Sequence, residues 1–213
     1  MKKSILLLLS LLTAITGCAP LFSDMQGARL VGKRQFELTP GYSSVAMVSQ
    51  DYKGGVANFA GLQAAYGLSD QVDLRFRYEH AWLKESFQVD EIGDMPFNIY
   101  SIGPKINVVR DRVSLFLPML LIAESLAQFQ PTFLFTVPLA PRQVEFNPSV
   151  KYLFNLCSAC SGNMVAFNFG MAFSNDTSKW AIRPEYGVLY SFADSGRFSN
   201  FSIGLSFKMS RDR

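Results

Sequence analysis

The chain has 213 residues, of which 49% are hydrophobic and 14% aromatic, and its formal charge is +3. That length suits one or two soluble domains, or a single barrel of roughly 8 to 12 membrane strands. Because Lys2 and Lys3 lie in a segment that we expect to be removed, the mature chain is nearly balanced in charge, which gives no support to the binding of nucleic acid.

The N-terminus predicts export from the cytoplasm. A basic start precedes an apolar run, residues 5–15, that is too short to span about 30 Å of hydrocarbon, so residues 1–17 are expected to be a cleaved signal peptide. Residues 15–18, Ile-Thr-Gly-Cys, resemble the lipobox of bacterial lipoproteins. The resemblance implies that Cys18 becomes the first residue, carrying acyl chains such as palmitate, and that residues 18–32 form a lipidated periplasmic tether. The alternative is an ordinary signal peptide with a chance cysteine.

From residue 33 onward one pattern repeats to the end of the chain. Apolar side chains alternate with small or polar ones in segments such as 72–83, 144–154 and 180–192, which gives each segment one bulky apolar face. Turn residues separate these segments, and no convincing amphipathic helix occurs. The pattern predicts an all-β fold, an antiparallel up-and-down transmembrane β-barrel of about ten strands (8–12) over residues 33–209, followed by a short tail, 210–213.

The faces of these segments indicate which side meets lipid. The second face carries charges such as Asp73, Arg75 and Glu145, which cannot sit in the core of a two-sheet sandwich. Periodicity alone would equally fit a soluble barrel with its apolar face inside. Aromatic residues near the segment ends, the lipoprotein signal and the alternation of short and long connections favour lipid on the apolar face. We therefore expect short periplasmic turns and longer external loops.

The charged face then lines the lumen. Near-equal numbers of opposite charges in a narrow lumen should pair, because an unpaired charge away from bulk water costs several kcal/mol. We expect an internal salt-bridge plug, the alternative being a wet, open pore lined by the same charges. The expected network, joined by Lys208, comprises Glu37, Asp73, Arg75, Arg77, Glu79, Lys105, Glu145, Arg183 and Glu185.

The external half of the lumen should have an apolar lining instead. Such a lining is either packing filler or a pocket for an acyl chain or a hydrophobic solute. The residues expected there are Met47, Phe59, Leu83, Leu120, Ile122, Leu153, Met164, Leu189 and Phe198.

Two prolines suggest a weak point in the barrel wall. Pro104 and Pro118 flank the turn at residues 110–112 at nearly equal distances, so in a tight hairpin they would face each other, and neither can donate a ladder hydrogen bond. This resembles, in principle, barrels of the PagP and OmpW kinds, in which interrupted pairing lets lipid or apolar solutes pass sideways. We expect a candidate lateral gate here, or else a simple bend in the strands.

Cys157 and Cys160 form a CxxC pair in an expected external loop. Such a pair can be a redox centre or half of a zinc site, but zinc needs two further ligands and the chain has a single histidine, His80. In an exported protein a small disulfide at a loop tip is the favoured interpretation. We expect no metal site and no cofactor.

The sequence predicts a protein without catalytic activity. His80 falls on the predicted lipid-facing stripe between Tyr78 and Trp82, where it cannot meet a luminal serine or aspartate unless a one-residue bulge moves it inside. No phosphate-binding glycine-rich motif and no GxSxG motif occur in the sequence.

The last segment adds a partly independent signal. Residues 202–209, with a polar residue, a glycine and two spaced hydrophobic residues, resemble the C-terminal sorting signal of outer-membrane barrels. The whole chain thus resembles bacterial outer-membrane β-barrels, here with a lipoprotein signal. The resemblance implies an outer-membrane location and contact with outer-membrane lipids and the barrel assembly machinery. Two functions follow as expectations: a porin-like narrow pore or hydrophobic-solute channel, and a structural or accessory subunit that binds other envelope proteins.

Overall fold

The structure, a computed structural model, describes residues 23–49, 52–84, 96–122, 126–156, 162–192 and 196–209. The first four strands are β1 (Phe36–Val48), β2 (Lys53–Gly67), β3 (Val72–Leu83) and β4 (Phe97–Val109). Short strands follow: β5 (Val113–Phe116), β6 (Met119–Ile122), β7 (Leu126–Phe129), β8 (Thr132–Phe135) and β9 (Val137–Ala140). The last four are β10 (Val144–Asn155), β11 (Met164–Phe173), β12 (Trp180–Ser191) and β13 (Arg197–Met209).

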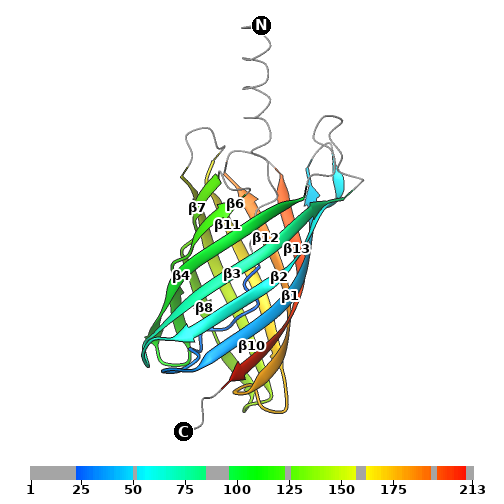
Figure 1. Cartoon of the computed structure of the whole chain (residues 1–213). Helices are drawn as coiled ribbons and strands as arrows, with labels where there is room; N and C mark the ends of the chain where they lie inside the picture. The colour runs from blue at the N-terminus through cyan, green and yellow to red at the C-terminus, as the bar shows by residue number, and fades with distance from the viewer. Residues whose placement is uncertain are drawn as a thin grey trace, which may run out of the picture.

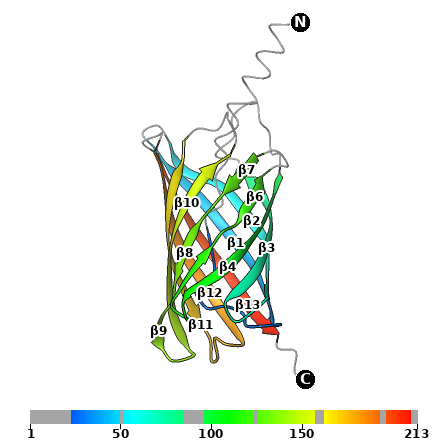
Figure 2. The ribbon, with the colours of Figure 1, turned by 90° about the vertical axis from the view of Figure 1, so that its left-hand side faces the viewer.

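These segments form one closed antiparallel barrel (Figures 1 and 2). β5 and β6 continue one another in register, as do β7, β8 and β9, so the segments make ten barrel strands. β1 pairs with β13 from Phe36 opposite Met209 to Val48 opposite Arg197, which closes the ladder. The predicted fold and strand number are confirmed. None of the residues that the structure describes lies in a helix long and apolar enough to cross a membrane.

The two ends of the barrel differ. The hairpins at residues 68–71, 110–112, 141–143 and 174–179 lie at one end, together with the start of β1 and the end of β13; we call this the turn end. This end, with the end of β13, lies at the bottom of Figure 1. The opposite end, which receives the connections such as that between β3 and β4, is called the loop end. Short turns therefore gather at one end of the barrel, as the alternation of connections predicts, while the side of the membrane that each end faces stays a prediction.

Alternation along the strands separates two surfaces. Large apolar side chains such as Phe76, Phe169, Tyr186 and Phe201 are exposed on the outside, while charged and small polar side chains are buried inside. Because successive strand residues point to opposite faces, the pattern of β3 predicts this arrangement directly. The outside of the barrel is therefore an apolar band and its middle is ionic.

The pairing near the two prolines differs from the prediction by one residue. Val109 lies opposite Val113, but an irregularity at Val108 shifts the register, so that Lys105 lies opposite Phe116 and Ile102 opposite Met119. Pro118 therefore faces Gly103 and Pro104 faces Leu117, rather than each other. The amide of Leu117 donates to the carbonyl oxygen of Pro104 (3.0 Å), so the ladder keeps a bond between them.

Candidate functional site

The lumen is occupied by the chain itself. Residues 23–32, which we call the luminal segment, run inside the barrel before β1 begins (Figure 1). Ser23 and Ala28 are fully buried, and Asp24 and Met25 are 1% and 3% exposed. This differs from the expectation of a tether in the periplasm. The physical reason is that the backbone amides and carbonyls of this segment satisfy charged groups on the barrel wall.

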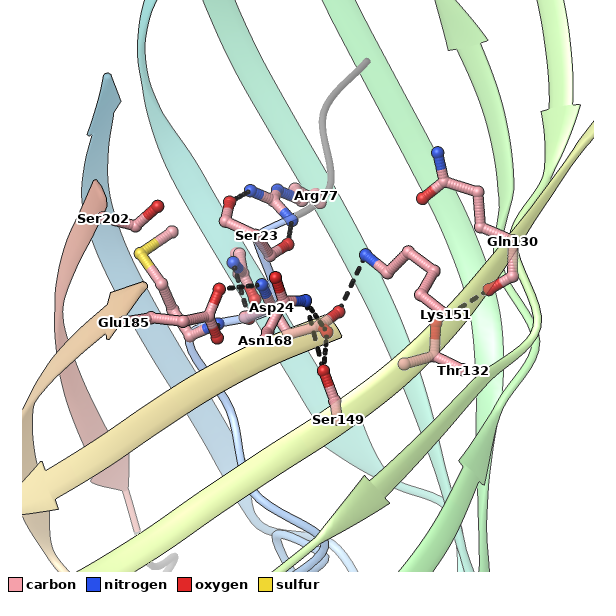
Figure 3. Close-up of polar contacts among 12 residues, drawn as sticks. Ser23, Asp24, Arg77, Gln130, Thr132, Ser149, Lys151, Asn168, Glu185 and Ser202 are labelled. Atoms are coloured by element: carbon pink, nitrogen blue, oxygen red, sulfur yellow. Dashed lines mark hydrogen bonds and ion pairs between the residues drawn. The ribbon is translucent and has the colours of Figure 1, made fainter. Parts of the chain in front are cut away.

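Three side chains of the barrel wall bind the carboxylate of Asp24 in the luminal segment (Figure 3). One carboxylate oxygen lies 2.9 Å from Nζ of Lys151, and the other accepts hydrogen bonds from Oγ of Ser149 (2.5 Å) and Nδ2 of Asn168 (2.8 Å). Ser149 and Asn168 lie opposite each other on β10 and β11, so the ladder itself brings these two donors together. A fully buried carboxylate is stable only with such partners.

Glu185 on β12 holds the backbone on either side of that carboxylate. Its two oxygens accept hydrogen bonds from the amides of Asp24 (2.7 Å) and Met25 (2.8 Å). Met25 has a left-handed backbone conformation (φ 49°), which turns consecutive amides towards one anion. This conformation costs about 1–2 kcal/mol for a residue other than glycine, so the two charge-assisted bonds must outweigh it.

Arg77 fixes the inner end of the segment. Its guanidinium donates to the carbonyl oxygen of Ser23 (2.5 Å) and to Oγ of Ser23 (2.7 Å), and its Nε donates to the Glu79 carboxylate (2.7 Å). Because Glu79 neutralises the guanidinium, Arg77 can serve a neutral backbone carbonyl without leaving an uncompensated charge.

The part nearer the turn end is held through its backbone. Nζ of Lys105 donates to the carbonyl oxygens of Gly27 (2.6 Å) and Arg29 (2.8 Å). Oγ of Ser114 donates to the carbonyl oxygen of Ala28 (2.5 Å).

Three wall side chains complete this anchoring. Oγ1 of Thr136 accepts from the amide of Ala28 (2.7 Å), and a carboxylate oxygen of Asp73 accepts from the amide of Val31 (2.9 Å). Glu145 forms an ion pair with Arg29 at 3.2 Å. Contacts from β3, β4, β5 and β10 thus hold this part of the segment.

Two luminal glycines make room for Met25. Gly41 on β1 and Gly204 on β13 lie opposite each other. A Cβ atom added at Gly41 would lie 2.8 Å from Cε of Met25, and one at Gly204 would lie 3.1 Å from its Sδ. Larger residues here would exclude the side chain, so the wall is shaped to fit the segment.

The nine charged residues predicted to line the lumen all point inward, but they pair less with each other than expected. Arg75 lies 3.4 Å from Glu37 and 3.5 Å from Asp73, and Lys208 lies 4.0 Å from Glu37. Arg183 donates to Oγ of Ser206 (2.9 Å). Arg77 pairs with Glu79 and also serves the luminal segment. The other network members that serve it are Asp73, Lys105, Glu145 and Glu185.

One small cavity lies in the ionic part of the lumen. A cavity of about 20 Å³ lies beside Asp24, Arg77, Ser101 and Lys151, which is room for one or two water molecules. Within the described ranges, no three or more His, Cys, Asp and Glu side chains gather closely enough to hold a metal ion.

Towards the loop end the wall becomes apolar. We call this region the apolar chamber. It contains all nine residues predicted for an apolar lining; its buried members are Val45, Val56, Ala57, Phe59, Ala81, Ile99, Leu120, Ile122, Leu153, Ala166 and Leu189, with Met47, Leu83, Met164 and Phe198 packed against them.

The other predicted site residues do not join this arrangement. His80 lies on the outward stripe, with Nδ1 3.0 Å from Oδ1 of Asn98 and its ring 6.2 Å from that of Trp82. Cys18, Cys157 and Cys160 lie outside the described residues. The acylation and the disulfide therefore remain predictions.

One signal in the sequence could have revealed the luminal segment. The inward cations outnumber the inward acids of the strands by one, and the unmatched Lys151 pairs with Asp24. The cations are Arg75, Arg77, Lys105, Lys151, Arg183 and Lys208, against the acids Glu37, Asp73, Glu79, Glu145 and Glu185.

Comparison with known proteins finds likeness at the level of fold. The attachment invasion locus protein Ail of Yersinia pestis is 15% identical over 83% of this chain and 99% of its own, with a TM-score of 0.40. A de novo designed transmembrane β-barrel is 12% identical (83% and 97% covered, TM-score 0.39), and outer-membrane expressed OmpT of Vibrio cholerae is 9% identical (89% and 99% covered, TM-score 0.35).

The chain has the architecture of the bacterial outer-membrane β-barrels. The closed ladder, the apolar outer band and the ionic interior are the features of that architecture. No family model matches the chain, and no curated protein matches it. Its function is therefore argued from the lumen of the barrel.

Proposed function

We propose that this protein is a non-catalytic outer-membrane lipoprotein that forms a narrow pore, closed at rest by its own luminal segment. The class has short periplasmic turns and longer external loops, so the turn end faces the periplasm and the loop end faces outward. The observation that carries the proposal is the triple anchoring of the Asp24 carboxylate in the middle of the lumen by Lys151, Ser149 and Asn168.

The wall suggests what passes when the segment moves. Displacement of Asp24 would expose Lys151, Glu185 and Arg77, charges of both signs that hydrate readily, so the open lumen suits small polar solutes. A hydrophobic solute could enter only the apolar chamber. It would then have to leave sideways, and at the candidate gate of Pro104 and Pro118 the ladder bond from the Leu117 amide to the Pro104 carbonyl oxygen (3.0 Å) would first have to break.

The proposal is tested by weakening one anchor on the wall. In planar bilayers we expect the full chain to open rarely and Glu185→Gln to open more often, because an amide has one acceptor oxygen and its NH₂ group opposes the backbone amides of Asp24 and Met25. Arg183→Gln is the matched control: it removes a charge from the same strand, and Arg183 bonds to Ser206 rather than to the segment. Openings that do not differ between the two variants would contradict the pore.

A second function has the support of one observation. The luminal segment is bonded to strands around much of the barrel, from β1 to β12, which suits a barrel that never opens and serves as an accessory subunit of a larger envelope complex. This function would be favoured if Glu185→Gln showed no channel openings in planar bilayers and partner proteins were stably co-isolated from detergent extracts.

The absence of catalysis is proposed from the place of His80. Its ring lies on the outward face beside Asn98 and Trp82, away from the luminal Ser149 and Asp24. We expect purified protein to show no lipid hydrolysis that depends on this ring. Hydrolysis by the wild type that disappears in His80→Ala would contradict the proposal, with Asn98→Ala as the control for the loss of the local hydrogen bond.

A further inference from the structure

The direction of the luminal segment determines where in the barrel the preceding residues begin. The luminal segment ends at the turn end of the barrel, where the amide of Arg34, two residues beyond it, donates to the carbonyl oxygen of Gly67 (2.8 Å). Followed backwards along the chain, it climbs inside the barrel to Ser23, whose Oγ lies 3.3 Å from Oγ of Ser43. The chain before Ser23 therefore begins from the middle of the lumen.

The apolar chamber lies directly beyond Ser23. The next inward residue after Ser43 on β1, towards the loop end, is Val45. After Glu79 on β3 it is Ala81, and both Val45 and Ala81 are buried members of the chamber. The inward face of the wall thus changes from polar to apolar at the level of Ser23, within one inward-facing residue along each of these strands.

The opposite direction is closed to the preceding residues. The lumen between Ser23 and the turn end is filled by residues 24–32, whose backbone is bonded to the wall at Glu185, Lys105 and Asp73. Cys18 lies five residues before Ser23, so an extended chain carries it at most about 18 Å. The periplasmic surface is out of reach by that route.

The composition of the preceding residues fits the chamber. Residues 19–22 are Ala-Pro-Leu-Phe, an apolar run, and the interior of a membrane barrel is ordinarily polar. Apolar side chains are the ones that can pack against this wall without losing hydrogen bonds to water. The length, the direction and the composition point to the same occupant.

We propose that residues 19–22 occupy the apolar chamber, so that Cys18 and its acyl groups are held at the loop end, on the outer side of the membrane. For the proposed pore to conduct, residues 19–22 would have to leave the chamber together with the luminal segment. The acyl groups rest on the proposed lipoprotein character of Cys18. The barrel would then carry its own N-terminus through its lumen and present it externally.

Disulfide trapping tests the occupancy. In the full chain with Cys157→Ser and Cys160→Ser, Phe22→Cys is combined with Ala81→Cys in the chamber or with Ala181→Cys, an equally buried alanine near the turn end. After oxidation of isolated outer membranes, we expect most folded molecules to link residue 22 to residue 81, and none to link it to residue 181. Phe22→Cys with Val45→Cys guards against unfavourable geometry at one site, and the heat-dependent gel shift of barrels verifies folding.

The outcomes separate the two proposals. A link to residue 181, or no link to either residue 81 or residue 45 in folded protein, overturns the occupancy. Mass spectrometry of the N-terminal peptide reports acylation of Cys18: an unmodified Cys18 refutes the lipoprotein, and with it the external acyl anchor, while the link to residue 81 can still form. For the external position, an epitope inserted between Cys18 and Ala19 should bind its antibody on intact cells, and binding only after outer-membrane permeabilisation overturns it.

Discussion

Replacing Asp24 with alanine should convert a closed barrel into a conducting one. The substitution leaves Lys151 buried without a partner and removes the acceptor of Ser149 and Asn168, provided that the segment stays in place. Breaking a buried pair in this way costs about 3–5 kcal/mol. Because Lys151 regains water when the segment leaves, a shift of about a hundredfold to several thousandfold towards the displaced state is expected. Single-channel recording in planar bilayers measures the open fraction.

Two further variants make this result specific. Asp24→Asn keeps an acceptor for Ser149 but loses the charge, so its open fraction should lie between those of the wild type and Asp24→Ala. Asp70→Asn removes one acid from an exposed turn and should behave as the wild type. Asp24→Ala channels that stay as closed as those of Asp70→Asn would show that the segment does not close the lumen.

The barrel could be predicted because each strand carries the pattern of its two faces in its own sequence. Each strand crosses one boundary between lipid and lumen, and the side chains alternate with a period of two, so β3 and β12 reveal both of their faces in a dozen residues. Even the inward placement of buried ionic residues such as Lys105 and Glu185 follows from that alternation.

The luminal segment could not be predicted in the same way because nothing in it repeats. Residues 23–32 have no regular hydrogen-bonding pattern of their own, and their partners lie from 20 to 178 positions away in the chain. The interpretation of residues 18–32 as a tether followed from the lipobox resemblance and from their position before the first strand. Only the unmatched Lys151 and the facing glycines Gly41 and Gly204 indicate that a segment of chain lies inside the barrel.

The pairing of the two prolines shows that strand partners cannot be predicted by counting residues from a turn. Equal distances from the turn at residues 110–112 placed Pro104 opposite Pro118, but one extra residue at Val108 moved every later pair by one position. Val108 and Val109 both lie exposed beside the turn (59% and 51%), so the extra residue of this β-bulge leaves no mark on the alternation of buried side chains. The alternation of faces predicts which side a residue occupies, but it cannot locate such a shift.

The two arginines of β3 should respond differently to the same substitution. Arg77 donates to the carbonyl oxygen and to Oγ of Ser23, whereas Arg75 pairs with Glu37 and Asp73 on the wall. A hydrogen bond to a charged group contributes about 1.5–3 kcal/mol, so Arg77→Gln should raise the open fraction at least about tenfold. Arg75→Gln should leave the open fraction near that of the wild type and lower the temperature of the heat-dependent gel shift instead, because it weakens the contact of β3 with β1.

This pair of variants separates two ways of closing a lumen. If ion pairs across the wall alone blocked the passage, both substitutions would open it, since each removes one cation of the network. If the luminal segment closes it, only the arginine that touches Ser23 matters for conduction, and the other matters for the stability of the wall. Equal conductance of Arg75→Gln and Arg77→Gln channels, both above the wild type, would assign the closure to the salt-bridge network rather than to the segment.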